Sequence, residues 1–384
     1  MRNQLYYPQS IRILFVLGLL ISGSTFSYAQ QEPTQDSLVW KYKLPIWGQK
    51  AAERGYKLQL PYGINAMYVN TIVGLDISQF KLTVGDGSHQ DFIDEKINVN
   101  TLNFTKVRAY FNGFNFRPDA WIFPFLNVYG IITTGAGATE VELAPRIPYG
   151  DGNDILQLPS FGSKVNFKAN AYGLGGTFVY GFGRNYFVSA DANYSWTVSD
   201  LLEDNVGVVT ASGRVGEHWN LGKRKDKKLA VYVGFMYRNF TNSKGTRGQI
   251  NLSEVFPDLE TNVNNGINNR IETNQQTISD NTDLINSLHP IDDREQIADL
   301  RAENRVLTIK NAALTEVSEG LSESGVFDTE IKYEIKKTML QNWTFEFGAS
   351  YNLSDHWAIR SEIGASKEQT LILAGLAYRF GLRK

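Results

Sequence analysis

Side chains able to do covalent chemistry are few in this sequence. The chain has no Cys and only four His, at His89, His218, His289 and His356. None of them forms an HExxH pattern or a His pair at metal-binding spacing. Ser212 and His218 lie six residues apart on one expected strand, a separation of about 20 Å that excludes a direct hydrogen bond. The sequence therefore predicts no catalytic, cofactor or metal site and no enzyme.

A different set of polar residues is more informative, because its members carry charge in the middle of segments where apolar and polar residues alternate. The six residues are Asp191, Arg214, Arg238, Glu346, Arg360 and Glu362. Charges away from water persist only when they are paired. Facing positions predict that Asp191 meets Arg214, and that Arg360 lies between Glu346 and Glu362. We therefore expect these residues to form a charge network inside an enclosed lumen.

The segments that carry these charges have the two-residue period of strands. Over 186–196, one face is apolar and begins and ends with an aromatic residue, Tyr186 and Trp196, while the other face is mostly polar. At a tilt of about 45°, this length rises about 23 Å, the height of the apolar band of a membrane barrel. The segments 343–352, 357–365 and 372–380 repeat the pattern. A soluble β-sandwich also alternates, but mid-strand charges on the second face favour a barrel lumen.

Composition and the N-terminus agree with an exported barrel. The chain has 34 Gly, 22 Phe, 19 Tyr and 7 Trp, a composition typical of β-rich proteins, and its net charge of −2 argues against nucleic acid as a partner. Residues 1–29 are predicted to be a signal peptide. Arg2 and Arg12 supply its positive charge, an apolar run follows, and cleavage is expected before Gln30. Residues 30–60 have no clear period, and we interpret them as a periplasmic N-terminal extension.

We predict an all-β fold, an antiparallel transmembrane β-barrel of about ten strands. Strands 1–7 lie within 61–241 and strands 8–10 within 337–384; twelve strands result if the long segments 62–84 and 121–143 are each broken. The expected strands are 62–84, 99–115, 121–143, 165–182, 185–199, 206–221, 229–241, 337–352, 357–366 and 369–380. Their connections alternate between short turns, including 116–120, and longer loops, as in bacterial barrels whose turns face the periplasm.

Residues 257–326 differ from the rest, because they contain no Phe, Tyr or Trp. Ile271, Ile278 and Ile285 recur every seven residues, as do Leu300, Leu307, Leu314 and Leu321; Asn274, Asn281, Asn304 and Asn311 take the other seam position. Such heptads predict a coiled-coil-like helical insert. It could be an antiparallel hairpin, an oligomeric stalk or a partly disordered loop, and parity of the connections places it outside the cell.

Two stretches carry a resemblance to known proteins. The last strand ends in Tyr378-Arg379-Phe380, which resembles the assembly signal of bacterial outer-membrane barrels, although four residues follow it. The run 119–130 resembles a stretch in uncharacterised Gram-negative barrels, and the overall style is similar to Bacteroidota outer-membrane proteins. The resemblance covers about 62–241 and 337–380. It implies a location in the cell outer membrane, contact with outer-membrane lipid, and insertion by the barrel assembly machinery through Tyr378 and Phe380.

Three functions remain open on these observations. The first is a non-enzymatic barrel with a binding, adhesion or envelope-structural role, which displays the insert 257–326 to an extracellular ligand or to other copies of itself. The second is a narrow transport channel, although a ten-stranded barrel is largely filled by its own side chains. The third, a lipid-modifying enzyme, lacks a recognisable catalytic set.

Overall fold

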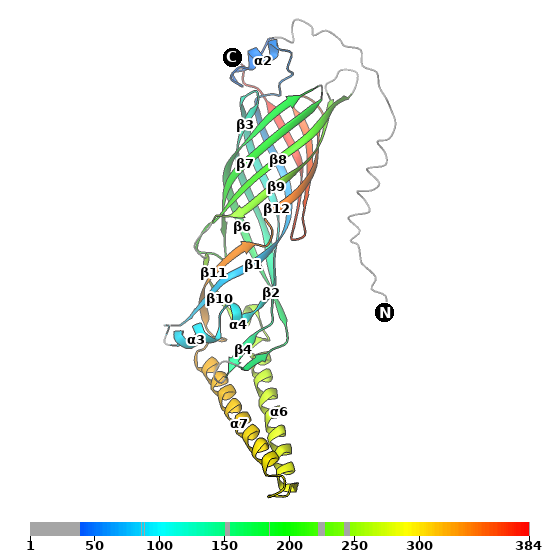
Figure 1. Ribbon diagram of the computed structural model, residues 1–384. Coiled ribbons are helices and arrows are strands. Elements are labelled where there is room, and N and C mark those ends of the chain that lie inside the picture. The colour runs from blue at the N-terminus through cyan, green and yellow to red at the C-terminus, as the bar shows by residue number, and fades with distance from the viewer. Residues whose placement is uncertain are drawn as a thin grey trace.

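The computed structural model of the protein describes residues 39–85, 87, 89–149, 154–183, 185–221, 227–241 and 246–383. The expected signal peptide, residues 1–29, lies outside the described residues, as does the beginning of the extension 30–60. Within the described part, long strands form a barrel, and most of the helices gather beyond one of its ends (Figure 1).

Ten of the described strands form one closed antiparallel barrel, which confirms the predicted fold class. They are β1 (Tyr62–Val84), β2 (Phe104–Phe123), β3 (Leu126–Leu143), β6 (Phe161–Phe182), β7 (Tyr186–Ser199), β8 (Val206–Leu221), β9 (Lys227–Phe240), β12 (Trp343–Asn352), β13 (Trp357–Ala365) and β14 (Gln369–Phe380). β1 closes the ring, because it pairs with both β14 and β2. A closed ring leaves no backbone edge exposed to lipid.

The outer face of the ring is apolar and aromatic. On β7 the exposed and less exposed positions alternate along the whole strand, and Tyr186, Val188, Tyr194 and Trp196 are all on the outer face. Phe235 on β9 and Phe345 on β12 continue this belt, and their rings meet edge to face with centroids 5.6 Å apart. Exposed apolar side chains in this number are stable only against lipid.

In the described part of the chain, no helix has both the length and the hydropathy needed to span a bilayer.

The two ends of the barrel have different connections. The beginning of β1, the end of β14 and the turns 124–125 and 353–356 lie at one end, which we call the turn end. The longer connections lie at the opposite end, the loop end. Near the turn end, the short helix α2 (Gly48–Glu53) packs through Trp47, whose ring lies 5.0 Å from that of Phe123.

Two strand boundaries differ from the prediction. The expected turn 116–120 lies inside β2, which continues to Phe123, so the turn between β2 and β3 is Pro124-Phe125. Within that segment, Pro118 occupies a ladder position opposite Ile64. The expected strand 337–352 is two strands, because β11 (Glu330–Met339) ends before β12 begins. Uninterrupted β1 and β3 exclude the twelve-stranded ring.

Beyond the loop end, the connections fold together into a unit that we call the loop-side module. It comprises the second half of β1, β4 (Arg146–Tyr149), β5 (Asp154–Gln157), β10 (Thr246–Asn251), β11, α3 (Gln90–Lys96), α4 (Val99–Leu102), α5 (Leu252–Val255), α6 (Leu259–Ser287) and α7 (Arg294–Glu323). The second half of β1 pairs with β11, which pairs with β10. On this half of β1, Leu82 is buried while Lys81 and Thr83 are exposed, so its outer face is no longer that of a lipid-facing strand.

The module has a hydrophobic core of its own. Its fully buried members come from distant parts of the chain: Leu82, Ile93, Ile267, Leu314, Val326 and Ile331. The base of α6 contributes Leu259 and Val263, and the end of α7 contributes Val317 and Leu321. The helices are therefore anchored to the barrel by buried apolar contacts and not only by the chain connections.

Helices α6 and α7 form a hairpin that projects away from the barrel (Figure 1). Of the three alternatives for 257–326, this is the helical hairpin. Side-chain amides cross between the helices: Asn274 Nδ2 donates to Asn311 Oδ1 at 2.7 Å, and Asn281 Nδ2 donates to Asn304 Oδ1 at 2.9 Å. Lys310 binds Asp154 of β5 at 2.8 Å, and this hydrogen bond raises the pKa of the Lys310 ammonium.

Candidate functional site

The largest charge cluster in the lumen is centred on Arg214 of β8. Its guanidinium lies 3.0 Å from Glu346 Oε2 and 3.1 Å from Glu362 Oε1. The second oxygen of Glu362 accepts from Arg360 Nη2 at 3.0 Å and from Tyr232 Oη at 2.7 Å. Both carboxylates are buried, with exposed fractions of 0% for Glu346 and 1% for Glu362. Two positive and two negative charges thus share one buried network.

Glycines let these long side chains cross the lumen. Arg214 lies beside Gly234 of β9, and a Cβ on Gly234 would lie 2.8 Å from Arg214 Cγ. Tyr232 lies beside Gly348 of β12, where a Cβ would collide with its ring. Because neither neighbour has a side chain, Arg214 and Tyr232 reach past β9 and β12 to the carboxylate of Glu362 on β13.

A second cluster surrounds Asp191 of β7. Its carboxylate accepts from Tyr129 Oη at 2.8 Å and from Thr177 Oγ1 at 2.5 Å, and it lies 3.6 Å from Arg117 Nη2. The Arg117 guanidinium lies over the Tyr129 ring, 3.2 Å from its centroid. Tyr129 crosses over Gly175, which again has no side chain to obstruct it.

A third cluster closes the turn end. Asp119 accepts from Arg379 Nη2 at 2.8 Å, from Asn127 Nδ2 at 2.7 Å and from Asn65 Nδ2 at 2.7 Å. Arg379 also donates to the backbone carbonyl of Leu60 at 2.9 Å. Asp119 and Asn127 are both buried.

The predicted six-residue network is therefore divided, and one predicted pair is wrong. Asp191 does not meet Arg214; it lies opposite Ser212 and binds Arg117. The carboxylates of Glu346 and Glu362 are bridged by Arg214, while Arg360 binds Glu362 alone among the described ion pairs.

Arg238 takes part in none of the described ion pairs. Its Nη1 donates across the lumen to Thr71 Oγ1 of β1 at 3.4 Å.

Arg117 and Asp119 were outside the predicted site, although a signal for them is present. Asn115, Arg117 and Asp119 alternate with Phe114, Phe116 and Pro118, so the two-residue period continues through the expected turn. Because the expected strand ended at residue 115, Arg117 and Asp119 were assigned to a turn and not to the interior face of a strand. Ser212 and His218 lie on the same strand, β8, as the sequence analysis assumed.

The predicted assembly signal forms the outer surface of β14 at the turn end. The Tyr378 ring lies 4.9 Å from that of Trp357, and Phe380 stacks on Tyr62 with centroids 5.5 Å apart. Recognition by the assembly machinery stays a prediction.

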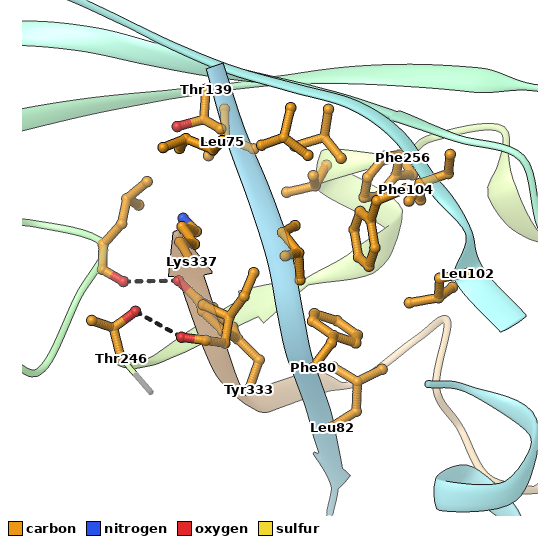
Figure 2. A pocket seen from close by; sticks show the side chains of 18 of the residues that line it. Leu75, Phe80, Leu82, Leu102, Phe104, Thr139, Thr246, Phe256, Tyr333 and Lys337 are labelled. Carbon is orange, nitrogen blue, oxygen red and sulfur yellow. Dashed lines mark hydrogen bonds between the residues drawn. The ribbon is translucent and has the colours of Figure 1, made fainter. Parts of the chain in front are cut away.

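Toward the loop end the interior changes from charged to mostly apolar and forms a partly open cavity of about 820 Å³. Its walls come from the loop-end halves of the barrel strands, including Leu75, Phe104 and Phe240, and from the module, including Phe256 and Tyr333 (Figure 2). Cavities of this size are typical of sites for small organic molecules. Among the described residues, no cluster of His, Asp or Glu has the geometry of a metal site.

No protein family matches the chain, and no curated protein matches it by sequence. Among solved structures it is similar to the translocator domain of the autotransporter NalP from Neisseria meningitidis, with a TM-score of 0.32 and 11% identity over 86% of this chain and 93% of that one. It is also similar to the β domain of the Bordetella autotransporter BrkA, with a TM-score of 0.30 and 9% identity over 83% of this chain and 100% of that one. The Escherichia coli outer-membrane protease OmpT gives a TM-score of 0.30 and 8% identity over 85% of this chain and 99% of that one.

These TM-scores are too low to assign a relationship, so the class of the protein follows from its own geometry. A closed antiparallel ring with an apolar, aromatic outer belt and a charged interior is the architecture of bacterial outer-membrane β-barrels. The protein is an outer-membrane β-barrel with a helical module at its loop end.

Proposed function

We propose that this barrel is a non-enzymatic binding protein that displays the loop-side module outside the cell, and that it does not conduct solutes. The observation that carries the proposal is the set of paired charges inside the lumen. The clusters around Asp119, Asp191 and Arg214 join strands that lie two or three places apart in the ring by ion pairs and hydrogen bonds. A permeating solute would have to separate buried charges, each of which is costly to leave unpaired.

The display part of the proposal is supported by the asymmetry of the ends. The connections of the turn end span a few residues each, whereas the loop end carries a module with its own core. Bacterial barrels have short periplasmic turns and longer external loops. At the tip of the hairpin, Ile291 is 79% exposed, which is unusual for a large apolar side chain on a polar helix pair. We infer that the hairpin contacts an extracellular ligand or another copy of this chain.

The chain's membrane partners are part of the same proposal. Outer-membrane lipid would contact the aromatic belt, and the assembly machinery would bind β14 through Tyr378 and Phe380. An origin among Bacteroidota is supported only by the overall style of the sequence, and the resemblance of 119–130 extends to Gram-negative barrels in general.

Conductance in planar bilayers tests the proposed absence of conduction. Purified wild-type protein should give no steady conductance. A variant in which Arg214, Glu346, Arg360 and Glu362 are all replaced by Ala should conduct, because this cluster is then removed without leaving one of its charges unpaired. Steady conductance of the wild type would favour the alternative function, a narrow transport channel.

A deletion that leaves the core of the loop-side module intact tests the display proposal. Removing Asp258 to Ser324 would take away Leu259, Ile267 and Leu314, which are buried in that core. Replacing only 278–307 by a short Gly/Ser linker keeps them. The shortened protein should remain folded, because the cost of closing a connection depends only weakly on its length. It should lose self-association in sedimentation or binding to whole host cells.

Protease added to intact cells gives the orientation. Cleavage within 278–307 is expected without permeabilisation. Cleavage only after permeabilisation would place the module in the periplasm and overturn the display proposal.

A further inference from the structure

The interior face of β11 contains one charged residue among apolar ones. Ile331, Ile335 and Met339 are buried on this face, and Lys337 shares it by the two-residue period of the strand. Lys337 lies opposite Ile77 of β1, which is also buried. Its side chain lines the cavity together with those of Leu75 and Thr139, all three of which are labelled in Figure 2.

Lys337 has no anionic partner among the residues that the structure describes. No ion pair or hydrogen bond within that part involves its ammonium group, and burial alone lowers the pKa of Lys337. The other charged residues of the cavity lining are accounted for differently. Lys96 binds Glu95 at 2.7 Å, Lys336 belongs to the opposite face of β11, and Glu254 is exposed.

We propose that the loop-side cavity binds a single-chain amphiphile with an anionic head, whose chain fills the apolar space and whose head is bound by Lys337. This site goes beyond the proposed display function and does not depend on it. An apolar cavity of about 820 Å³ is poorly suited to ordered water, which needs several polar partners. An apolar chain would remove its walls from water. An anionic head would supply a counter-charge for the half-buried ammonium of Lys337.

The walls explain why one extended chain fits better than a compact polar solute. The barrel contributes Val107, Val141 and Phe167, and the module contributes Phe80 and Leu259. Hydroxyls in the lining are already engaged in part: Thr246 donates to the carbonyl of Ile335 at 3.2 Å, and Tyr333 donates to that of Leu201 at 3.1 Å. Most of the other lining side chains are apolar, so an alkyl chain would find more contacts there than a sugar or a peptide would find hydrogen-bonding partners, and Lys337 offers one cation for one anionic head.

Displacement of a fluorescent fatty acid from the full mature protein in amphipol tests the site. The competing probes are palmitate, hexadecyl phosphate, hexadecanol and hexadecyltrimethylammonium, which share one chain and differ in the head. We expect palmitate or hexadecyl phosphate to compete at least about tenfold better than hexadecanol, as one charge-assisted hydrogen bond would give. Which anion competes better distinguishes a fatty acid from a single-chain phospholipid. Equal competition by all four probes, or strongest competition by the cation, would overturn the proposal.

Three variants locate the head and the chain. Lys337→Met should remove the preference for anions and leave hexadecanol unchanged, whereas Lys337→Arg should keep the preference. Lys332→Met is the matched control, because Lys332 lies on the exposed face of the same strand and should have no effect. Val141→Trp should reduce competition by every probe. If K337M keeps the anion preference, or if the V141W barrel is heat-modifiable and binds normally, the site is elsewhere.

Discussion

The two halves of the barrel interior are enclosed by the same ring of strands but are filled in different ways. Toward the turn end, long side chains such as Arg214, Tyr232 and Arg117 reach across the lumen and meet carboxylates from other strands. Toward the loop end, Val107, Ala109 and Val208 are too short to meet, and a cavity remains. A ring of this size can be filled by its own side chains only if they are long enough.

The difference assigns different physical roles to the two halves. In the charged half, ion pairs join strands two or three places apart in the ring, so each pair contributes to the stability of the barrel. The apolar half is hollow, and its cover is the loop-side module, whose core includes Ile267 and Leu314. Stability of the barrel and integrity of the cavity should therefore respond to different substitutions.

The largest expected effect comes from the charged half. Arg214→Ala should lower the free energy of unfolding by roughly 3–5 kcal/mol, because Glu346 and Glu362 would be left as adjacent buried carboxylates. Urea unfolding from lipid vesicles, followed by tryptophan fluorescence, measures this.

Lys164→Ala is the matched control for that experiment. Lys164 forms an ion pair with Glu140 whose two side chains are 59% and 37% exposed, and exposed pairs contribute about 0–1 kcal/mol. Equal effects of the two substitutions would mean that water enters the lumen and screens its charges.

The next effect is expected in the module and not in the barrel. Leu314→Ala creates a cavity at a fully buried position, which costs about 2–5 kcal/mol. Trypsin cleavage within the α6–α7 hairpin should become faster, while heat-modifiable migration of the barrel stays unchanged. Ile309→Ala, at a position that is 61% exposed on the same helix, should change neither. Loss of heat-modifiable migration in L314A would show that the two regions are energetically coupled.

A smaller effect is expected from the space that the Tyr232 ring needs to pass Gly348. This effect is distinct from that of the charges which Tyr232 meets. Gly348→Ala places a methyl group against the Tyr232 ring, so Tyr232 must move away from Glu362. Overpacking of this kind costs about 1–3 kcal/mol. Gly213→Ala is the control, because a Cβ there meets no atom within 4 Å. A stability of G348A equal to that of G213A would contradict the role given to Gly348.

The sequence predicted the elements of the charged half better than their contacts. The alternation of β7 and the mid-strand charges on β12 and β13 determine which face is interior, and both are local properties. Which charges meet depends on strand stagger and on glycines such as Gly234, which are not local. Arg117 and Asp119 were missed because the expected strand ended at residue 115.

The apolar half was harder to predict for a further reason. The heptads of α6 and α7 indicated two helices, but nothing in their period showed that Leu259 and Leu321 would line a cavity. That cavity forms where residues distant in sequence fail to fill a space. Lys337 on β11 appeared in the sequence only as one of several lysines near the expected strand 337–352.

The smallest expected effect concerns the polar seam of the hairpin. Asn274 is buried and donates to Asn311 at 2.7 Å. Replacing either residue by Ala removes this bond and leaves the other amide unsatisfied, at a cost of about 1 kcal/mol. The double variant should be less destabilised than the sum of the single ones, because no amide is left without its partner. Hydrogen exchange in α6 and α7 measures the three variants, with the amides of β7 as an internal reference. Strict additivity would show that Asn274 and Asn311 do not interact. If the amides of β7 also lose protection, the Asn274–Asn311 pair contributes to the stability of the barrel. The stabilities of the barrel and the module would then not be separate.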